Sequence, residues 1–182
     1  HGWQSHTYRW KRYIESLSKE EYTIHAFDAP GHGMSGGKFL SIPLYSDVIE
    51  AFINRTGTIE TIVSHSIGSF SALYTFYRKP TLSSNNLVTL ASPGEAQEFF
   101  DFYTRSLALS AKCSTLITNR FEELFQRTPH YFSAPIFASS LKVPGLIIHD
   151  EEDNDTSVVH SRRIHAAWKT SRLIMTKGFG HN

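Results

Sequence analysis

Apolar and polar residues alternate along the chain in two patterns. Short apolar runs bounded by Gly, Pro, Asn or Ser predict strands at residues 22–28, 58–65, 87–91, 143–149 and 172–176. Apolar residues spaced three or four apart predict helices at residues 43–54, 67–78 and 157–169. This alternation is typical of βαβ units built around a mainly parallel sheet, so we expect an α/β fold.

Residues 93–142 differ from the rest of the chain. They contain no strand signal, but they are rich in aromatic residues, and Phe121, Leu124 and Phe125 have the spacing of an amphipathic helix. One interpretation is a set of helices that packs on the core. The other is a helical lid over a site, which the length of the insertion favours.

The composition narrows the class of protein. The 182 residues allow one domain, and a hydrophobic fraction of 40% is that of a globular chain. Eighteen Lys and Arg against seventeen Asp and Glu give a net charge of +1, which offers no electrostatic footprint for nucleic acid. No apolar run reaches the roughly 18 residues of a membrane span. Cys113 is the single cysteine, so an internal disulfide and a Cys-based zinc site are excluded.

The two ends of the chain give little information on location. The chain begins at His1 without a Met or a targeting segment, and it ends at Asn182, one residue after a candidate catalytic histidine. We therefore expect a fragment that lacks the first strands and the last helix of its domain. A cytoplasmic location is the default expectation, and the oligomeric state stays open.

Ser66 lies at the centre of the strongest chemical signal. Residues 64–68 (SHSIG) stand between a predicted strand and a predicted helix, and they approach the pattern G-x-S-x-G with Ser64 in place of the first Gly. Acyl transfer needs a hydroxyl on such a turn, where N–H groups of the helix start face the developing oxyanion. Small residues two positions before and after the serine let the turn close.

A second turn is rich in glycine. Residues 27–35 (FDAPGHGMS) follow a predicted strand, which raises the possibility of a phosphate-binding loop. No Lys followed by Ser or Thr comes after the glycines, so the P-loop pattern fails. We interpret His32 as a structural residue of this turn.

Five short motifs stand together in one order: HGW, FDAPGHGMSGG, SHSIGS, HDEED and GFGH. In this order they resemble the α/β-hydrolase fold family, and the resemblance covers essentially the whole chain. It is nearest to serine esterases and lysophospholipase-like members with a helical cap. The resemblance implies a three-layer sandwich, with helices on both faces of a mainly parallel sheet. The hydrolase core would span residues 1–182, with a cap at approximately residues 93–142.

The resemblance also implies the roles of particular residues. The HGW turn is similar to the family's second oxyanion turn, so Trp3 and Ile67 would supply the two N–H donors. The acid follows the fourth predicted strand, at Asp153, with Asp150 second and Asp155 third. A calcium loop here fails, because its sixth and twelfth positions would be Val158 and Ile164 rather than Gly and Glu.

His181 is the expected base, because it follows the last predicted strand and stands among small residues. These residues predict a serine hydrolase that cleaves carboxylic esters, including acyl lipids, through Ser66, Asp153 and His181. The expected partner is a small-molecule ester or acyl substrate, with no metal and no cofactor. Other serine-triad chemistry (thioesterase, amidase or haloperoxidase-type) remains an alternative, as does a binding protein without activity.

Overall fold

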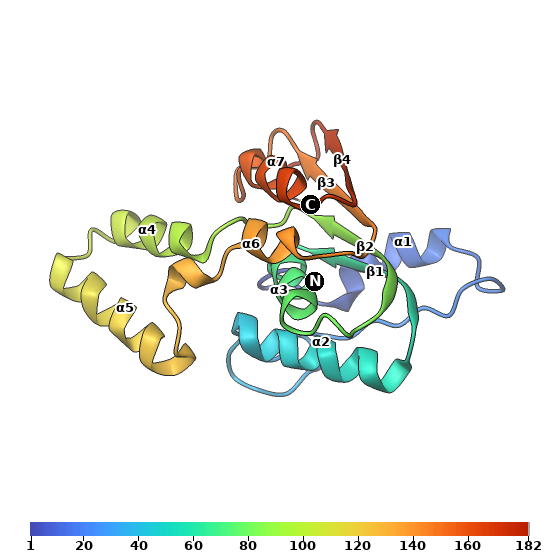
Figure 1. The fold of residues 1–182 in the computed structure, drawn as a ribbon, viewed down its shortest axis with the longest axis horizontal. Helices are drawn as coiled ribbons and strands as arrows, with labels where there is room; N and C mark the ends of the chain where they lie inside the picture. The colour runs from blue at the N-terminus through green and yellow to red at the C-terminus, as the bar shows by residue number, and fades with distance from the viewer. Residues whose placement is uncertain (182) are drawn as a thin grey trace.

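The computed structural model describes residues 1–181, and within them it shows a four-stranded parallel sheet in the order β1-β2-β3-β4 (Figure 1). The strands are β1 (Ile59–His65), β2 (Ser84–Leu90), β3 (Gly145–Asp150) and β4 (Ser171–Thr176). The sequence predicted each of these strands to within three residues at either end. Because all pairs are parallel, the carboxyl ends of the strands lie along one edge of the sheet.

Helices form a layer against this sheet. They are α2 (Ile42–Thr56), α3 (Ile67–Arg78), α6 (Ala134–Ser139) and α7 (Val158–Ala167). Helix α3 contacts β1 and β2, α7 contacts β3 and β4, and α6 lies between α3 and α7, while α2 packs on α3. Helix α2 begins as expected, because the hydroxyl of Ser41 accepts the N–H of Leu44 and a proline occupies the first turn.

The predicted strand at residues 22–28 is wrong. The structure has no strand there, and Tyr22 and Ile24 are exposed. An alternating apolar pattern fits a strand only where a neighbouring strand completes its hydrogen bonds, and no described strand runs beside this segment. Its last ring, Phe27, packs instead on Tyr45 and Phe52 of α2.

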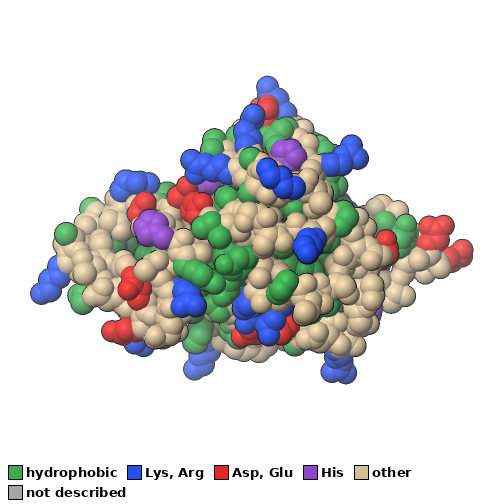
Figure 2. Space-filling model, viewed as in Figure 1, with side chains coloured by type: hydrophobic (Ala, Val, Ile, Leu, Met, Phe, Trp, Pro, Cys, Tyr) green, Lys and Arg blue, Asp and Glu red, His purple; other side chains and the backbone are tan. Residues whose placement is uncertain are grey.

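The N-terminal segment before this stretch carries two short helices, η1 (Thr7–Trp10) and α1 (Lys11–Ser16). The insertion between β2 and β3 begins with two longer helices, α4 (Ala96–Ser106) and α5 (Ala111–Phe125). The short helices η2 (Pro129–Tyr131) and α6 follow them. Helices α4 and α5 extend away from the sheet as an arm (Figure 1), and Figure 2 shows hydrophobic side chains between this arm and the main body. In residues 1–181, no helix combines the length and apolar character needed to cross a membrane.

The core joins the sheet, its helices and the end of the insertion. Phe70 of α3 stacks edge-on against Phe137 of α6, with ring centroids 5.7 Å apart, and both rings are buried. Phe132, which precedes α6, is buried against Tyr74. Trp168, directly after α7, is fully buried in the same core, and its indole N–H donates to the Val143 carbonyl at 3.0 Å.

Gly145, at the start of β3, lies directly against the indole ring of Trp168. A methyl group there would overlap that ring, so we expect Gly145→Ala to lower the free energy of unfolding by about 1–3 kcal/mol. Urea denaturation measures this change. The matched control is Gly36→Ala, since no atom lies within 4 Å of the added methyl, and its effect should stay within about 0.5 kcal/mol. Equal effects of the two substitutions would contradict this packing.

Candidate active site

Ser66 occupies a tight turn between β1 and α3. Its backbone has φ 54° and ψ −125°, in the left-handed region that residues other than glycine rarely adopt. The N–H of Ser66 donates to the Leu90 carbonyl of β2 at 2.8 Å, and its carbonyl accepts the N–H of Phe70 at 3.1 Å. The turn is thus fixed to the neighbouring strand on one side and starts the helix on the other, as the SHSIG pattern predicted.

The two small residues of this motif have different surroundings. Ser64 is buried, and its hydroxyl donates to the Val88 carbonyl of β2 at 2.9 Å, so a polar group replaces the usual glycine without being left unpaired. Gly68 faces the backbone of His1, whose carbonyl oxygen would lie 2.7 Å from a Cβ. The structure therefore requires glycine at position 68 and tolerates serine at position 64.

Three side chains predicted from the sequence meet at this turn. The Oγ of Ser66 lies 3.0 Å from Nε2 of His181, and Nδ1 of His181 lies 2.8 Å from Oδ2 of Asp153. This pattern assigns the imidazole proton to Nδ1, which leaves Nε2 free to accept from the hydroxyl. The residues come from the ends of β1, β3 and β4, which the parallel sheet brings to one edge.

Asp153 is buried and holds its charge through several donors. Burial acts to raise its pKa, but the backbone N–H of Thr156, the imidazole of His181 and the hydroxyl of Thr156 outweigh it and lower the pKa. The Thr156 N–H donates to Oδ1 at 2.8 Å, and its hydroxyl donates to Oδ2 at 2.9 Å. Thr156 was missed by sequence reasoning, although its position three residues after the acid is that of a turn residue.

Asp150, the second candidate for the acid, does not face the imidazole of His181 but the backbone of the loop that carries it. Its Oδ2 accepts the hydroxyl of Thr176 at 2.8 Å and the N–H of Phe179 at 3.1 Å, so it holds the loop that carries His181. Burial acts to raise its pKa, but these two donors and the N–H groups of Glu152 and Gly180 hold the pKa at about 2. Asp155, the third candidate, donates its backbone N–H to Asp153 and stays on the surface.

The HGW turn lies against Ser66. A Cβ on Gly2 would stand 3.0 Å from Cβ of Ser66, and the ring of His1 accepts the N–H of Ala29 at 2.8 Å. The backbone that leads into Trp3 therefore passes beside Ser66, and Ile67 opens α3 directly after Ser66. Both predicted oxyanion donors thus belong to segments that meet at Ser66.

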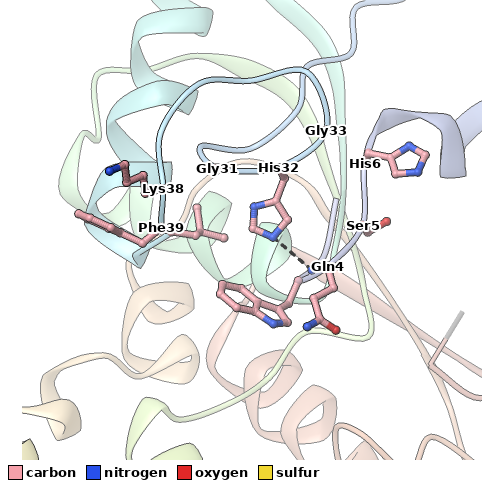
Figure 3. Close-up of a pocket in the computed structure, with 10 residues that line it drawn as sticks. Gln4, Ser5, His6, Gly31, His32, Gly33, Lys38 and Phe39 are labelled. Atoms are coloured by element: carbon pink, nitrogen blue, oxygen red, sulfur yellow. Dashed lines mark hydrogen bonds between the residues drawn. The ribbon is translucent and has the colours of Figure 1, made fainter.

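A cavity of about 400 Å³ adjoins the HGW turn (Figure 3). Trp3 and His32 both line it, with ring centroids 5.2 Å apart, and Lys38 and Phe39 come from the loop before α2. The backbone N–H of Gln4 donates to Nε2 of His32 at 3.2 Å. His32 thus joins two turns, which agrees with the structural role assigned to it from the sequence.

Metal ligands do not cluster in the described part of the chain: no group of three or more His, Cys, Asp or Glu side chains within residues 1–181 could hold an ion. His160, on α7, pairs with Glu98 of α4 at 3.0 Å.

The unusually acidic Asp150 makes stability depend on pH. Its folded pKa of about 2 lies below the ordinary value of about 3.9, so its contribution is present above that value and is lost as pH falls through the folded pKa. We expect the difference in unfolding free energy between wild type and Asp150→Asn to shrink as pH falls from 6 to 3, as measured by urea titrations. Asp155→Asn is the control, because that residue contributes only a backbone N–H, which the substitution keeps. The same pH-dependent change in both variants would contradict the assignment to Asp150.

Three solved structures illustrate the likeness of the fold. A monoacylglycerol lipase from Paleococcus ferrophilus is 21% identical with a TM-score of 0.73, over 100% of this chain and 84% of that chain. An esterase from Exiguobacterium antarcticum is 16% identical with a TM-score of 0.76, over 100% and 83%. A bromoperoxidase from Bacillus anthracis is 15% identical with a TM-score of 0.72, over 100% and 83%. At these identities the likeness shows the fold alone.

No curated protein matches the chain significantly. The model of the alpha/beta hydrolase family, by contrast, matches residues 1–178, which is nearly the whole sequence. The parallel sheet, the strand–turn–helix at Ser66 and the order of the motifs agree with that match. The chain belongs to the alpha/beta hydrolase family.

Proposed function

We propose that this protein is a serine hydrolase that cleaves carboxylic esters through Ser66, His181 and Asp153. The observation that carries the proposal is the continuous hydrogen-bonded chain from the Ser66 hydroxyl to the Asp153 carboxylate, with steps of 3.0 and 2.8 Å. A hydroxyl paired with an imidazole that a buried carboxylate orients is the arrangement of an activated serine nucleophile.

The proposed reaction has two halves. Nε2 of His181 takes the proton of Ser66 as Oγ attacks the carbonyl carbon of the ester, and the imidazolium then gives this proton to the departing alcohol. A water molecule, deprotonated by the same imidazole, attacks the acyl-enzyme, and the imidazolium returns the proton to Oγ of Ser66 as the ester bond breaks and the acid leaves. Asp153 keeps the imidazole in the required tautomer and stabilises its charged form.

Two backbone N–H groups would stabilise the tetrahedral intermediate. Ile67 offers one at the start of α3, where the helix dipole also favours negative charge, and Trp3 offers the other. Each such donor is typically worth roughly 3 kcal/mol in the transition state. The support for Trp3 is the close approach of Gly2 to Ser66, which only a residue without Cβ permits.

For the substrate class we propose esters with an apolar acyl part, because α4 exposes the aromatic side chains of Phe99, Phe102 and Tyr103. The insertion at residues 93–142 would act as a cap, because Glu98 of α4 pairs with both His160 and Arg163 of α7 and so ties the arm to the helix after the Asp153 loop. Two structures similar in fold are an esterase and a monoacylglycerol lipase, which agrees with this class.

Ser66→Ala tests the nucleophile directly. Wild type should form a stoichiometric adduct with a fluorophosphonate, located on Ser66 by mass spectrometry, because the imidazole activates that hydroxyl. Ser66→Ala should form no adduct and should lose at least about a thousandfold in ester hydrolysis. Ser64→Ala is the matched control two residues away and should keep the adduct on Ser66. An unlabelled, folded wild type would contradict the proposal and favour a binding protein without activity.

Asp153→Asn separates the acid from its acidic neighbours. An asparagine in place of this carboxylate keeps the shape but favours the wrong imidazole tautomer, so kcat should fall by about 10⁴-fold. Steady-state kinetics with a panel of p-nitrophenyl esters of different chain lengths measure this loss and the acyl preference together. Asp155→Asn should keep kcat within a few-fold of wild type. A comparable loss in both variants would overturn the assignment of the acid.

A further inference from the structure

His65 stands directly before the proposed nucleophile, and nothing in the mechanism uses its side chain. It is 3% exposed at the end of β1, and its ring centroid lies 4.9 Å from that of His181. Its Nε2 lies 2.7 Å from the backbone carbonyl oxygen of His181. This contact joins residues that are 116 positions apart in the chain.

The surroundings of Nε2 determine where the proton of His65 resides. The carbonyl of His181 can only accept, and the guanidinium of Arg9, with Nη2 at 3.4 Å, can only donate. The carbonyl contact is much the shorter, so Nε2 carries the proton and donates to it. Burial, followed by the charge of Arg9, lowers the pKa of His65 to about 3, and the ring is therefore neutral at physiological pH.

The other ring nitrogen of His65, Nδ1, makes no hydrogen bond within the described residues. It is buried, and a Cβ on Gly2 would come within 2.9 Å of it. A buried polar atom without a partner destabilises a fold, and an apolar side chain of similar size would avoid that cost. Packing alone therefore does not account for a histidine here, whereas a donor at Nε2 does.

The loop that His65 contacts depends on such support. Residues 177–181 follow β4, and Gly178 and Gly180 both have positive φ, at 88° and 61°. Asp150 holds this loop at Phe179, two residues before the imidazole. His65 contacts the backbone of His181 itself. A small rotation of the backbone there would move Nε2 of His181 away from Ser66.

We propose that His65 is a positioning residue, whose Nε2–H holds the backbone carbonyl of His181 so that the imidazole stays in line with the Ser66 hydroxyl. This inference rests on the proposed function, since it concerns the same imidazole. It adds a residue that neither touches the substrate nor moves a proton. His65 thereby links the turn that carries the nucleophile to the loop that carries the base.

Two substitutions at His65 distinguish positioning from packing. His65→Met keeps a similar volume without a donor, whereas His65→Gln offers an amide N–H that can reach the same carbonyl. We expect His65→Met to lower kcat by roughly 10- to 100-fold, as a displacement of about 1 Å in a catalytic group does, with KM changed less than about twofold. His65→Gln should recover most of the loss. His165→Met, on α7 away from the site, is the control and should leave kcat unchanged.

The measurements are kcat and KM with a p-nitrophenyl ester, the rate of fluorophosphonate labelling of Ser66, and urea denaturation. The inference is overturned if both His65 variants keep the kcat of wild type. It is also overturned if both lose kcat equally and in proportion to the fraction of unfolded protein. In either case, labelling of wild type at Ser66 leaves the proposed function standing. An unlabelled wild type would overturn the proposed function itself and this inference with it.

A measurement on the unsubstituted protein tests the donor role of His65 even where the variants fail to fold. Long-range ¹H–¹⁵N correlations of the imidazole rings report which nitrogen of each histidine carries the proton. A proton on Nε2 of His65 at neutral pH supports the donor role. A proton on Nδ1 would overturn it, because the carbonyl of His181 would then have no donor from this ring.

Discussion

The backbone of Ser66 is the constraint on which the rest of the site depends. A serine with φ of 54° is strained by an amount typically of about 1–3 kcal/mol, and such a conformation persists only where its surroundings overdetermine it. Here the surroundings do so from three sides. The Ser66 N–H bonds to β2, its carbonyl begins the hydrogen bonds of α3, and Gly68 lets the backbone of His1 pack closely. This backbone conformation directs Oγ of Ser66 away from the sheet. The parallel topology then brings the side chains of His181 and Asp153 to the same edge.

Asp150 and Asp153, three residues apart at the end of β3, hold His181 through different groups. Asp153 faces the imidazole itself, whereas Asp150 faces the backbone of the loop. Both pKa values are lowered, although burial opposes this in each case, because each carboxylate accepts several N–H or O–H donors. A shifted pKa alone would therefore not have told the orienting acid from the structural one. The direction of their hydrogen bonds does.

Much of the fold was predictable from the sequence, because hydrophobic period and turn chemistry are local. The strands before Ser66 and before Asp150 follow from short apolar runs with clear boundaries. Residues 22–28 have the same pattern, yet the structure forms no strand there, since pairing depends on a neighbour that a local pattern cannot reveal. Ser66, Asp153 and His181 were predicted from motif order, and the structure brings their side chains together. The contacts of His65 and Thr156 were not predicted, because they join residues that are distant in the sequence or involve a turn hydroxyl that no motif marks.

The insertion between β2 and β3 combines two parts with different constraints. Phe132 and Phe137 belong to its second part and are fully buried with Phe70, so this part belongs to the core and must keep its volume. Helices α4 and α5 have no buried residue, and they meet the main body through the pairing of Glu98 with His160 and through Phe121 and Phe125, whose rings pack on Phe132. Substitutions at the exposed positions of the arm, such as Phe102 and Leu116, therefore act on few core contacts, whereas Phe121 and Phe125 are held by the core. Under the proposed function, the choice of substrate can then change at the exposed positions of α4 and α5 while the geometry at Ser66 is kept, because those positions take no part in the packing around Phe132.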